Sequence, residues 1–265
     1  MLLLCAVLLI SASGCGSENN TGKTGAVNSS EAGTETRTGP LSGHHLQIFC
    51  DVDMQAPLAD ITTAFEQQTG ATAEIIFGTE EQLTNQIRSR YTGDIFIASA
   101  KSETGTLKSE GYIADSLPLV ERLPVLAVPA GNPGRITNLK ALSRKKVYLA
   151  DTKSDLIGKI GIQILSDNDI DPSGENISFI EGHEALLEAL QSGEADAAIV
   201  WNEPASEAEG VQILHSADLS GYSRTVPALS LSTCSDKEAQ AAFLDFLKSG
   251  DANKIWKKHN YIMAS

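Results

Sequence analysis

The sequence predicts a two-lobe α/β protein in which each lobe is a mostly parallel sheet flanked by helices. Two runs of alternating predicted strands and helices, over 45–98 and 146–201, favour this class because such alternation is typical of parallel sheets covered by helices. Two further predicted strands, over 123–128 and 226–232, each lead from one run to the other. Two such crossings make a hinge, so we expect a cleft between the lobes.

The first run begins after residue 44, where the composition becomes that of a globular protein. A helix is expected over Pro57–Thr69 because Leu58, Ile61 and Phe65 recur at the spacing of one helix face, and Gly70 ends it. The other elements of this run are strands over 45–50, 73–77 and 94–98 and a helix over 80–90. Together with the C-terminal part of the chain they form the expected lobe 1, over 44–124 and 225–265.

The second run begins after an apolar strand, Leu123–Val128, which is closed by the turn residues Pro129–Pro133. The elements expected after it are strands over 146–150, 177–180 and 195–201 and helices over 157–165 and 184–192. They form the expected lobe 2, over 125–224. Two helices, over 237–249 and 252–259, close the chain on lobe 1.

The N-terminal segment has the features of an export signal. Its apolar run, Leu2–Ile10, falls well short of the roughly twenty residues that span a bilayer. Small residues then precede Cys15, a pattern similar to a lipoprotein processing site, so residues 1–15 are expected to be a signal that ends in a lipidated cysteine. The alternative is a plain signal peptide cleaved near Gly14. Residues 16–43 lack large apolar side chains and are expected to form a flexible stalk.

Charge and cysteine content narrow the possible functions. The formal net charge of −14 argues against a nucleic-acid partner and against electrostatic binding to anionic lipid headgroups. Outside the signal region the chain has two cysteines, Cys50 and Cys234. They are candidates for a disulfide in an exported protein, but the sequence does not place them within bonding distance.

The residues that follow the predicted strands are the first candidates for a binding site, because ligands of open parallel sheets lie beyond the carboxyl ends of the strands. These segments are 51–54, 78–80, 99–100, 151–158, 182–183 and 201–203.

Five stretches, in this order and spacing, resemble the molybdate- and tungstate-binding proteins of ABC importers, which have the type II periplasmic binding protein fold. The stretches are Phe65–Gly70, Gly93–Phe96, Val125–Pro133, Gly193–Val200 and Ala242–Leu247. The resemblance covers nearly all of 45–265. It implies an extracytoplasmic, lipid-tethered monomer that binds an oxyanion, needs no cofactor and passes its ligand to an ABC permease.

The resemblance also implies a ligand site. In that family a tetrahedral oxyanion is held by two hydroxyls, two backbone amides and a tyrosine, and the matching positions are Asp53, Thr79, Ile157, His183 and Trp201. Ile157 and His183 would act through backbone N–H groups at helix starts, where partial positive charge favours an anion. Ser99 and Asp151, which follow other predicted strands, complete the expected ligand-binding set.

Asp53 and Trp201 depart from the family pattern. A carboxylate where a hydroxyl is expected repels an oxyanion by roughly 4 kcal/mol at about 4 Å and an effective dielectric near 20. Three solutions stay open: a protonated Asp53 that donates, a Mo or W centre that takes oxygens of Asp53 or Asp151 as ligands, and a changed ligand, either a metal cation or a basic or polar organic solute.

Each candidate also has a purely structural interpretation. Asp51, Asp53 and Thr79 are residue types that cap helices, and Trp201 is suited to a core position. His183 fits an exposed position beside Gly182.

Catalysis is disfavoured because no glycine-rich phosphate loop, nucleophile elbow or metal-ligand cluster is present in the sequence. An extracellular sensor that binds a solute without transport is a third class, and the sequence does not separate it from an importer receptor.

Overall fold

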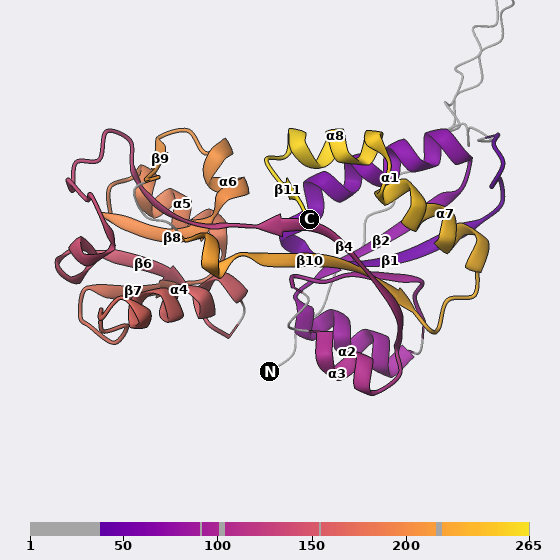
Figure 1. Ribbon diagram of the computed structural model, residues 1–265, viewed down its shortest axis with the longest axis horizontal. Coiled ribbons are helices and arrows are strands. Elements are labelled where there is room, and N and C mark those ends of the chain that lie inside the picture. Colours follow the sequence, from indigo (N-terminus) through magenta and orange to yellow (C-terminus); the bar gives the residue numbers. More distant parts are fainter. Residues whose placement is uncertain (1–37, 91, 101–103, 154, 216–218, 265) are drawn as a thin grey trace, which may run out of the picture. The chain divides into compact units, whose positions relative to one another are not determined.

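The computed structural model describes residues 38–264 except 91, 101–103, 154 and 216–218, and it contains two mixed sheets (Figure 1). The six-stranded sheet has the order β11-β4-β10-β3-β1-β2, and we call it, with its helices, lobe 1. The five-stranded sheet has the order β7-β6-β8-β5-β9, and it forms lobe 2 with its helices. Cys15 and nearly all of the expected stalk lie outside the described residues.

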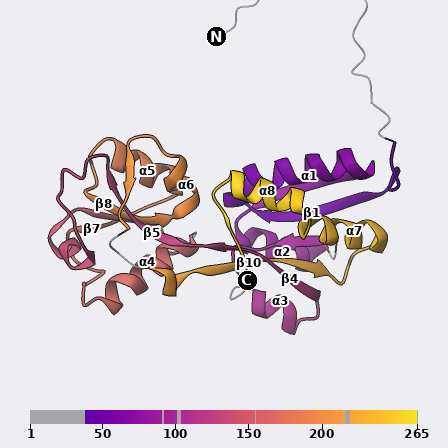
Figure 2. The same ribbon diagram turned by 45° about the horizontal axis from the view of Figure 1, so that its top comes forward.

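Lobe 1 is built from both ends of the described chain. Its strands are β1 (His45–Asp51), β2 (Thr72–Gly78), β3 (Ile95–Ile97), β4 (Ile113–Arg122), β10 (Arg224–Leu231) and β11 (Ile262–Met263). Its helices are α1 (Gln55–Thr69), α2 (Glu80–Arg90), α3 (Gly105–Ser109), α7 (Lys237–Leu247) and α8 (Gly250–Lys258). Helices α1, α7 and α8 cover one face of the sheet and α2 and α3 the other (Figures 1 and 2).

Lobe 2 comes from the middle of the chain. Its strands are β5 (Pro124–Pro129), β6 (Val147–Ala150), β7 (Ile177–Ile180), β8 (Ala197–Trp201) and β9 (Val211–Ile213). Its helices are α4 (Leu156–Asp167), α5 (His183–Gln191) and α6 (Asn202–Glu207).

The apolar residues that recur at helical spacing in the sequence pack into the hydrophobic core of lobe 1. Leu58, Ile61 and Phe65 of α1 are fully buried, and Phe65 makes an edge-to-face contact with Phe243 of α7 at a centroid distance of 5.0 Å. Each such side chain contributes about 1.5–3 kcal/mol by leaving water. Gly70 ends α1 with a φ of 79°, as expected for a left-handed C-terminal residue.

A close approach explains the glycine of the Gly93–Phe96 stretch. Gly93 has a φ of 109°, and a Cβ there would lie 2.3 Å from the ring of Phe49. The next residue, Asp94, is buried and accepts a hydrogen bond from the backbone N–H of Gln47 at 2.7 Å. This pair therefore fixes the start of β3 beside β1.

The expectation of mostly parallel sheets is wrong in one respect. Strand β1 pairs in parallel with β2 and β3, but β10 pairs antiparallel with β3 and β4, and β5 pairs antiparallel with β8 and β9. The antiparallel pairs arise because the chain enters lobe 2 along β4 and β5 and comes back along β10. Arg122 and Arg224 are register partners at the ends of β4 and β10 that lead toward lobe 2.

The described end of the expected stalk makes contacts with lobe 1. Leu41 is 6% exposed, and its backbone N–H donates to the carbonyl of Thr69. Packing against the lobe therefore begins before the expected boundary at residue 44. Cys50 and Cys234 are both buried free thiols, so the candidate disulfide is not formed. None of the helices in the described part of the chain is long and apolar enough to cross a membrane.

Candidate ligand-binding site

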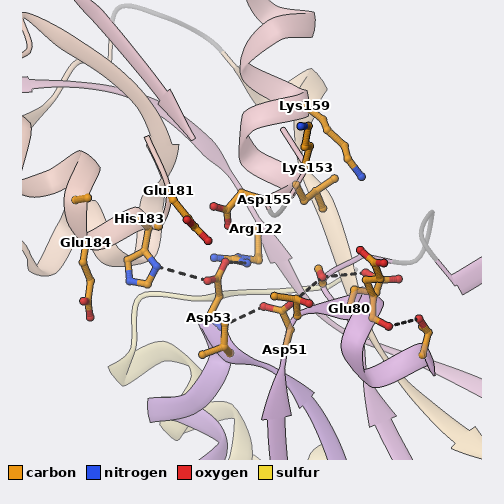
Figure 3. Close-up of a pocket in the computed structure, with 18 of the residues that line it drawn as sticks. Asp51, Asp53, Glu80, Arg122, Lys153, Asp155, Lys159, Glu181, His183 and Glu184 are labelled. Atoms are coloured by element: carbon orange, nitrogen blue, oxygen red, sulfur yellow. Dashed lines mark hydrogen bonds and ion pairs between the residues drawn. The ribbon is translucent and has the colours of Figure 1, made fainter. Parts of the chain in front are cut away.

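A cleft of about 990 Å³ is lined by both lobes. Lobe 1 contributes the residues after β1 and β3 and the first turn of α2, and lobe 2 contributes the segments that lead into α4 and α5. Figure 3 shows acidic and basic side chains pointing toward one another across this space. The location agrees with the rule that ligands lie beyond strand ends.

The centre of the cleft is an ion-pair cluster of Asp53, Arg122 and His183 (Figure 3). An Nη atom of Arg122 donates to Oδ2 of Asp53 at 3.0 Å, and Nδ1 of His183 lies 3.5 Å from Oδ1 of the same carboxylate. Asp53 and Arg122 come from lobe 1, whereas His183 begins helix α5 of lobe 2. The cluster therefore joins the lobes at their common site.

Lobe 2 also supports the guanidinium of Arg122, whose side chain is 2% exposed. Its Cζ lies 4.4 Å from the ring centroid of Trp201, a cation–π geometry, and its Nε lies 3.6 Å from a carboxylate oxygen of Glu203. The Nε atom and that oxygen make no hydrogen bond. Arg122 is thus held by two carboxylates and one aromatic face.

Local backbone structure places Asp53. A short 3₁₀ turn over Val52–Met54 follows β1, and the side chain of Asp51 starts it by accepting a hydrogen bond from the backbone N–H of Asp53 at 3.1 Å. Asp51 thus caps this short turn and not the helix expected near Pro57, since α1 begins at Gln55 without a side-chain cap. The turn leaves Val52 47% exposed, so an apolar side chain also faces the cleft.

A second acidic cluster lies beside the first. The hydroxyl of Ser99 lies 2.7 Å from Oδ2 of Asp51 and 2.9 Å from a carboxylate oxygen of Glu80. One hydroxyl hydrogen serves only one of two acceptors at a time. The Ser99 hydroxyl therefore lies between the carboxylates of Asp51 and Glu80 on the lobe 1 side of the cleft.

The titration of these groups follows from burial and from Arg122. Burial opposes ionisation of Asp53, but the charges of Arg122 and His183 and their hydrogen bonds prevail and hold its pKa well below the usual range. Burial and the nearby Asp53 charge raise the pKa of Asp51 to about 6. The hydrogen bond to Asp53 raises the pKa of His183, and burial raises the pKa of Glu203.

Side chains of the protein cap the start of α2, whereas α4 and α5 begin without a side-chain cap. Thr79 and Gln82 form a reciprocal capping pair at the start of α2: the backbone N–H of Thr79 donates to Gln82, and the Thr79 hydroxyl accepts from the backbone N–H of Gln82. The Asp155 carboxylate accepts from the backbone N–H of Gly182, just before α5. Burial, followed by the Asp53 charge, raises the pKa of Asp155.

A family model described as bacterial extracellular solute-binding protein matches residues 46–262. The chain belongs to this family. The molybdate-binding protein ModA of Azotobacter vinelandii is 21% identical over 237 residues, which are 82% of this chain and 89% of that protein.

Solved structures of other binding proteins share the fold of this family member. One from Clostridium difficile, described as the substrate-binding domain of a molybdenum ABC transporter, has a TM-score of 0.73 at 20% identity and covers 83% of this chain and 99% of its own. Iron-bound HitA from Pseudomonas aeruginosa has a TM-score of 0.67 at 16% identity and covers 81% and 84%. These likenesses confirm the two-lobe type II periplasmic binding protein fold.

The structure of this solute-binding protein brings four expected site residues to the cleft: Asp53, Thr79, Ser99 and His183. The other three are not among the described residues that line it. Asp151 lies after β6 and accepts from the backbone N–H of Lys153 at 2.7 Å, Ile157 is 2% exposed in α4, and Trp201 is 1% exposed beneath Arg122.

Sequence reasoning missed Arg122 as a site residue and did not include Asp51, Glu80 or Asp155 in the ligand-binding set. A signal for Arg122 was present, because it stands directly before the apolar run that crosses to lobe 2. A charged residue at such a crossing either reaches solvent or meets a partner in the cleft. Arg122 meets Asp53.

Proposed function

We propose that this solute-binding protein is the lipid-anchored receptor of an ABC importer, which holds one small ligand in the cleft and delivers it to a permease. Membership of an extracellular solute-binding family supports the extracytoplasmic location and the receptor role. The observation that carries the proposal is the cluster of Asp53, Arg122 and His183, because both lobes contribute charged groups to one central point of the cleft.

Molybdate or tungstate is the ligand that the relatives suggest. Thr79, Ser99 and His183 line the cleft, and Arg122 brings a positive charge to its centre. Asp53 opposes this ligand. Because Arg122 and His183 keep its pKa low, Asp53 is ionised at neutral pH, and the solution in which a protonated Asp53 donates to the oxyanion loses its support.

A positively charged or polar organic solute is the second candidate, and the charges of the cleft favour it. The described lining residues include eight carboxylates, namely Asp51, Asp53, Glu80, Glu81, Asp155, Glu181, Glu184 and Glu188. They include four basic side chains other than histidine, namely Arg88, Arg122, Lys153 and Lys159. A metal cation has less support, since no group of three metal-binding side chains was found in the described ranges.

Isolation of the protein from its native membranes tests the receptor role without assuming a ligand. Native mass spectrometry should show a bound species that mild denaturation releases, and elemental analysis for Mo and W should decide whether that species is the oxyanion. A fully loaded sample with neither metal would move the assignment to the second candidate. A protein that never carries a small molecule, and whose scattering profile no candidate ligand changes, would contradict the receptor role.

The lipid anchor has its own test. Cys15→Ser should move the protein from the membrane fraction to the soluble extracytoplasmic fraction, because one acylated cysteine would be the sole tether. Cys5→Ser is the matched control, since Cys5 lies within the apolar run of the signal. Continued membrane association of Cys15→Ser would contradict lipidation at this position.

A further inference from the structure

The two walls of the cleft, one from each lobe, carry charge of the same sign. The described lining residues of lobe 1 include four carboxylates and two basic side chains other than histidine, and those of lobe 2 include the same numbers. Each wall therefore has a formal excess of two negative charges, four against two. Like charges repel more strongly as they approach. Closure of the cleft thus needs an attraction that outweighs this repulsion.

Asp53 and His183 supply an attraction across the cleft. Nδ1 of His183 lies 3.5 Å from Oδ1 of Asp53, and the two side chains point toward one another in Figure 3. Asp53 belongs to the turn Val52–Met54 of lobe 1, and His183 is the first residue of α5 in lobe 2. The contact consists of protein atoms alone, so its formation requires no ligand.

The lobe 1 partner of this contact is oriented before the lobes meet. Arg122 donates to Oδ2 of Asp53 at 3.0 Å, which leaves Oδ1 toward His183. The backbone N–H of Asp53 donates to the side chain of Asp51 and fixes the turn. The charges of Arg122 and His183 and their hydrogen bonds outweigh burial and keep the pKa of Asp53 low, so its carboxylate is ionised at neutral pH.

The lobe 2 partner is oriented as well. Gly182 precedes α5 with a φ of 85°, and its backbone N–H donates to the carboxylate of Asp155. The His183 side chain is 34% exposed and the Asp53 side chain 14% exposed. The hydrogen bond to Asp53, together with the charges of Asp53 and Glu184, raises the pKa of His183 although burial and Arg122 oppose this. The contact therefore favours an imidazolium opposite a carboxylate.

The contacts of Arg122 with lobe 2 have a different position. Arg122 is the last residue of β4, and the chain passes from it into lobe 2. Its guanidinium lies over the ring of Trp201 at 4.4 Å. Because Arg122 lies at the crossing itself, this packing survives a separation of the lobes. The contact between Asp53 and His183 does not survive it, since the two residues stand on opposite walls.

We infer that the contact between Asp53 and His183 closes the cleft of the ligand-free protein against the repulsion of its two walls. His183 is then a positioning residue, which sets the balance between open and closed states before any ligand is bound. This role goes beyond the proposed receptor function. For a partly exposed pair with one largely buried partner, loss of the contact should change the ratio of closed to open molecules about fivefold.

Double electron–electron resonance measures this ratio. Spin labels carried by unnatural amino acids at Asn85 of α2 and at Glu175 in lobe 2, both exposed, report the distance between the lobes without use of the cysteines. The full chain is first freed of bound molecules by mild denaturation and refolding, and native mass spectrometry checks that it is empty. We expect a mainly short distance in the wild type and about fivefold more of the long distance in His183→Ala. His215→Ala, at an exposed histidine outside the described lining of the cleft, is the matched control and should leave the ratio unchanged.

A second background tests whether His183 acts through Asp53. In Asp53→Asn the carboxylate charge is absent, so the further change His183→Ala should alter the ratio by less than about twofold. An equal effect of His183→Ala in both backgrounds would overturn the inference, because the imidazole would then act through another group. The thermal unfolding of each variant shows whether its lobes stay folded.

The remaining outcomes also decide the question. A ligand-free wild type with only the long distance would overturn the inference, and so would a His183→Ala variant with the wild-type ratio. A short distance that forms only after sodium molybdate is added would overturn it as well but would support the receptor role. Because the comparison of variants uses no ligand, its failure leaves the receptor role intact, and that role fails separately if the natively isolated protein never carries a small molecule.

Discussion

Asp53→Asn separates the two roles assigned to this carboxylate, as counter-ion of Arg122 and as barrier to oxyanions. The substitution keeps the size and shape of the side chain but removes its charge. Asp53 is 14% exposed and Arg122 is 2% exposed, so the pair is largely withdrawn from water. Removal of one partner of a buried ion pair costs about 3–5 kcal/mol because the other charge is left uncompensated.

The structure favours the lower end of that range. Glu203 lies 3.6 Å from the Nε of Arg122 and Trp201 covers its guanidinium, so part of the compensation survives. A loss of about 3 kcal/mol corresponds to a fall in Tm of about 6–12 °C for a domain of this size. Differential scanning calorimetry measures it directly. Asp245→Asn, on a side chain that is 76% exposed, is the control and should change the unfolding free energy by less than about 0.5 kcal/mol.

The same variant should gain oxyanion binding. Removal of a like charge about 4 Å from a bound oxyanion relieves roughly 4 kcal/mol at an effective dielectric near 20. This corresponds to a roughly thousandfold lower Kd for the oxyanion. Tungstate should therefore raise the Tm of Asp53→Asn and leave that of the wild type unchanged. If Asp53→Asn has the Tm of the wild type, Asp53 is not the counter-ion of Arg122. If tungstate does not raise the Tm of the variant, the charge of Asp53 is not what excludes the oxyanion.

Substitutions at Asp51, Trp201 and Gly158 test further features of the region around the cleft. The pKa of Asp51 rises from 3.8 to about 6 on folding, so the folded state binds more protons between these pH values. The free energy of unfolding therefore falls as the pH rises through this range. In urea unfolding, Asp51→Asn should remove about 3 kcal/mol of this pH dependence. Trp201→Leu should cost about 3 kcal/mol in the same assay, and Trp201→Phe clearly less because an aromatic face still covers Arg122. Gly158→Ala should cost about 1–3 kcal/mol, because its Cβ would lie 2.2 Å from the carbonyl oxygen of Ala150, whereas Gly105→Ala, with open space around it, should be neutral. Each expectation has an outcome that contradicts it. These outcomes are a stability difference between Asp51→Asn and the wild type that does not change with pH, equal losses of stability in the two tryptophan variants, and equal stability of the two alanine variants.

Elements with a clear period or an apolar run were predictable from the sequence. Helix α2 and strand β7 have the expected bounds, and α1 differs by two residues at its start. Strand β4 was missed because Asp115, Ser116 and Pro118 interrupt any apolar pattern, and much of the strand is exposed. Pairing with β10 along its length overrides this weak propensity.

The site was predictable only where strand ends determine it. Asp53, Thr79, Ser99 and His183 follow strands directly, so the location of the cleft follows from the order of the elements. The orientation of Trp201 was not predictable, since a residue at a strand end faces either the ligand or the core. Trp201 packs in the core of lobe 2, and Arg122, which lies over its ring, comes from strand β4, which the sequence did not reveal.

The contact between Asp53 and His183 has a consequence for the timescale of ligand exchange. Arg122, at the end of β4, and its neighbour on β10 mark the hinge, while His183 approaches Asp53 from the other lobe. Separation of the lobes must break this 3.5 Å contact whether or not a ligand is present. The residence time of a bound molecule therefore depends on the rate at which the Asp53–His183 contact opens. Proximity to Asp53 favours the charged imidazolium of His183. The contact between the two side chains is therefore stronger, and release of the ligand slower, as the surroundings become more acidic.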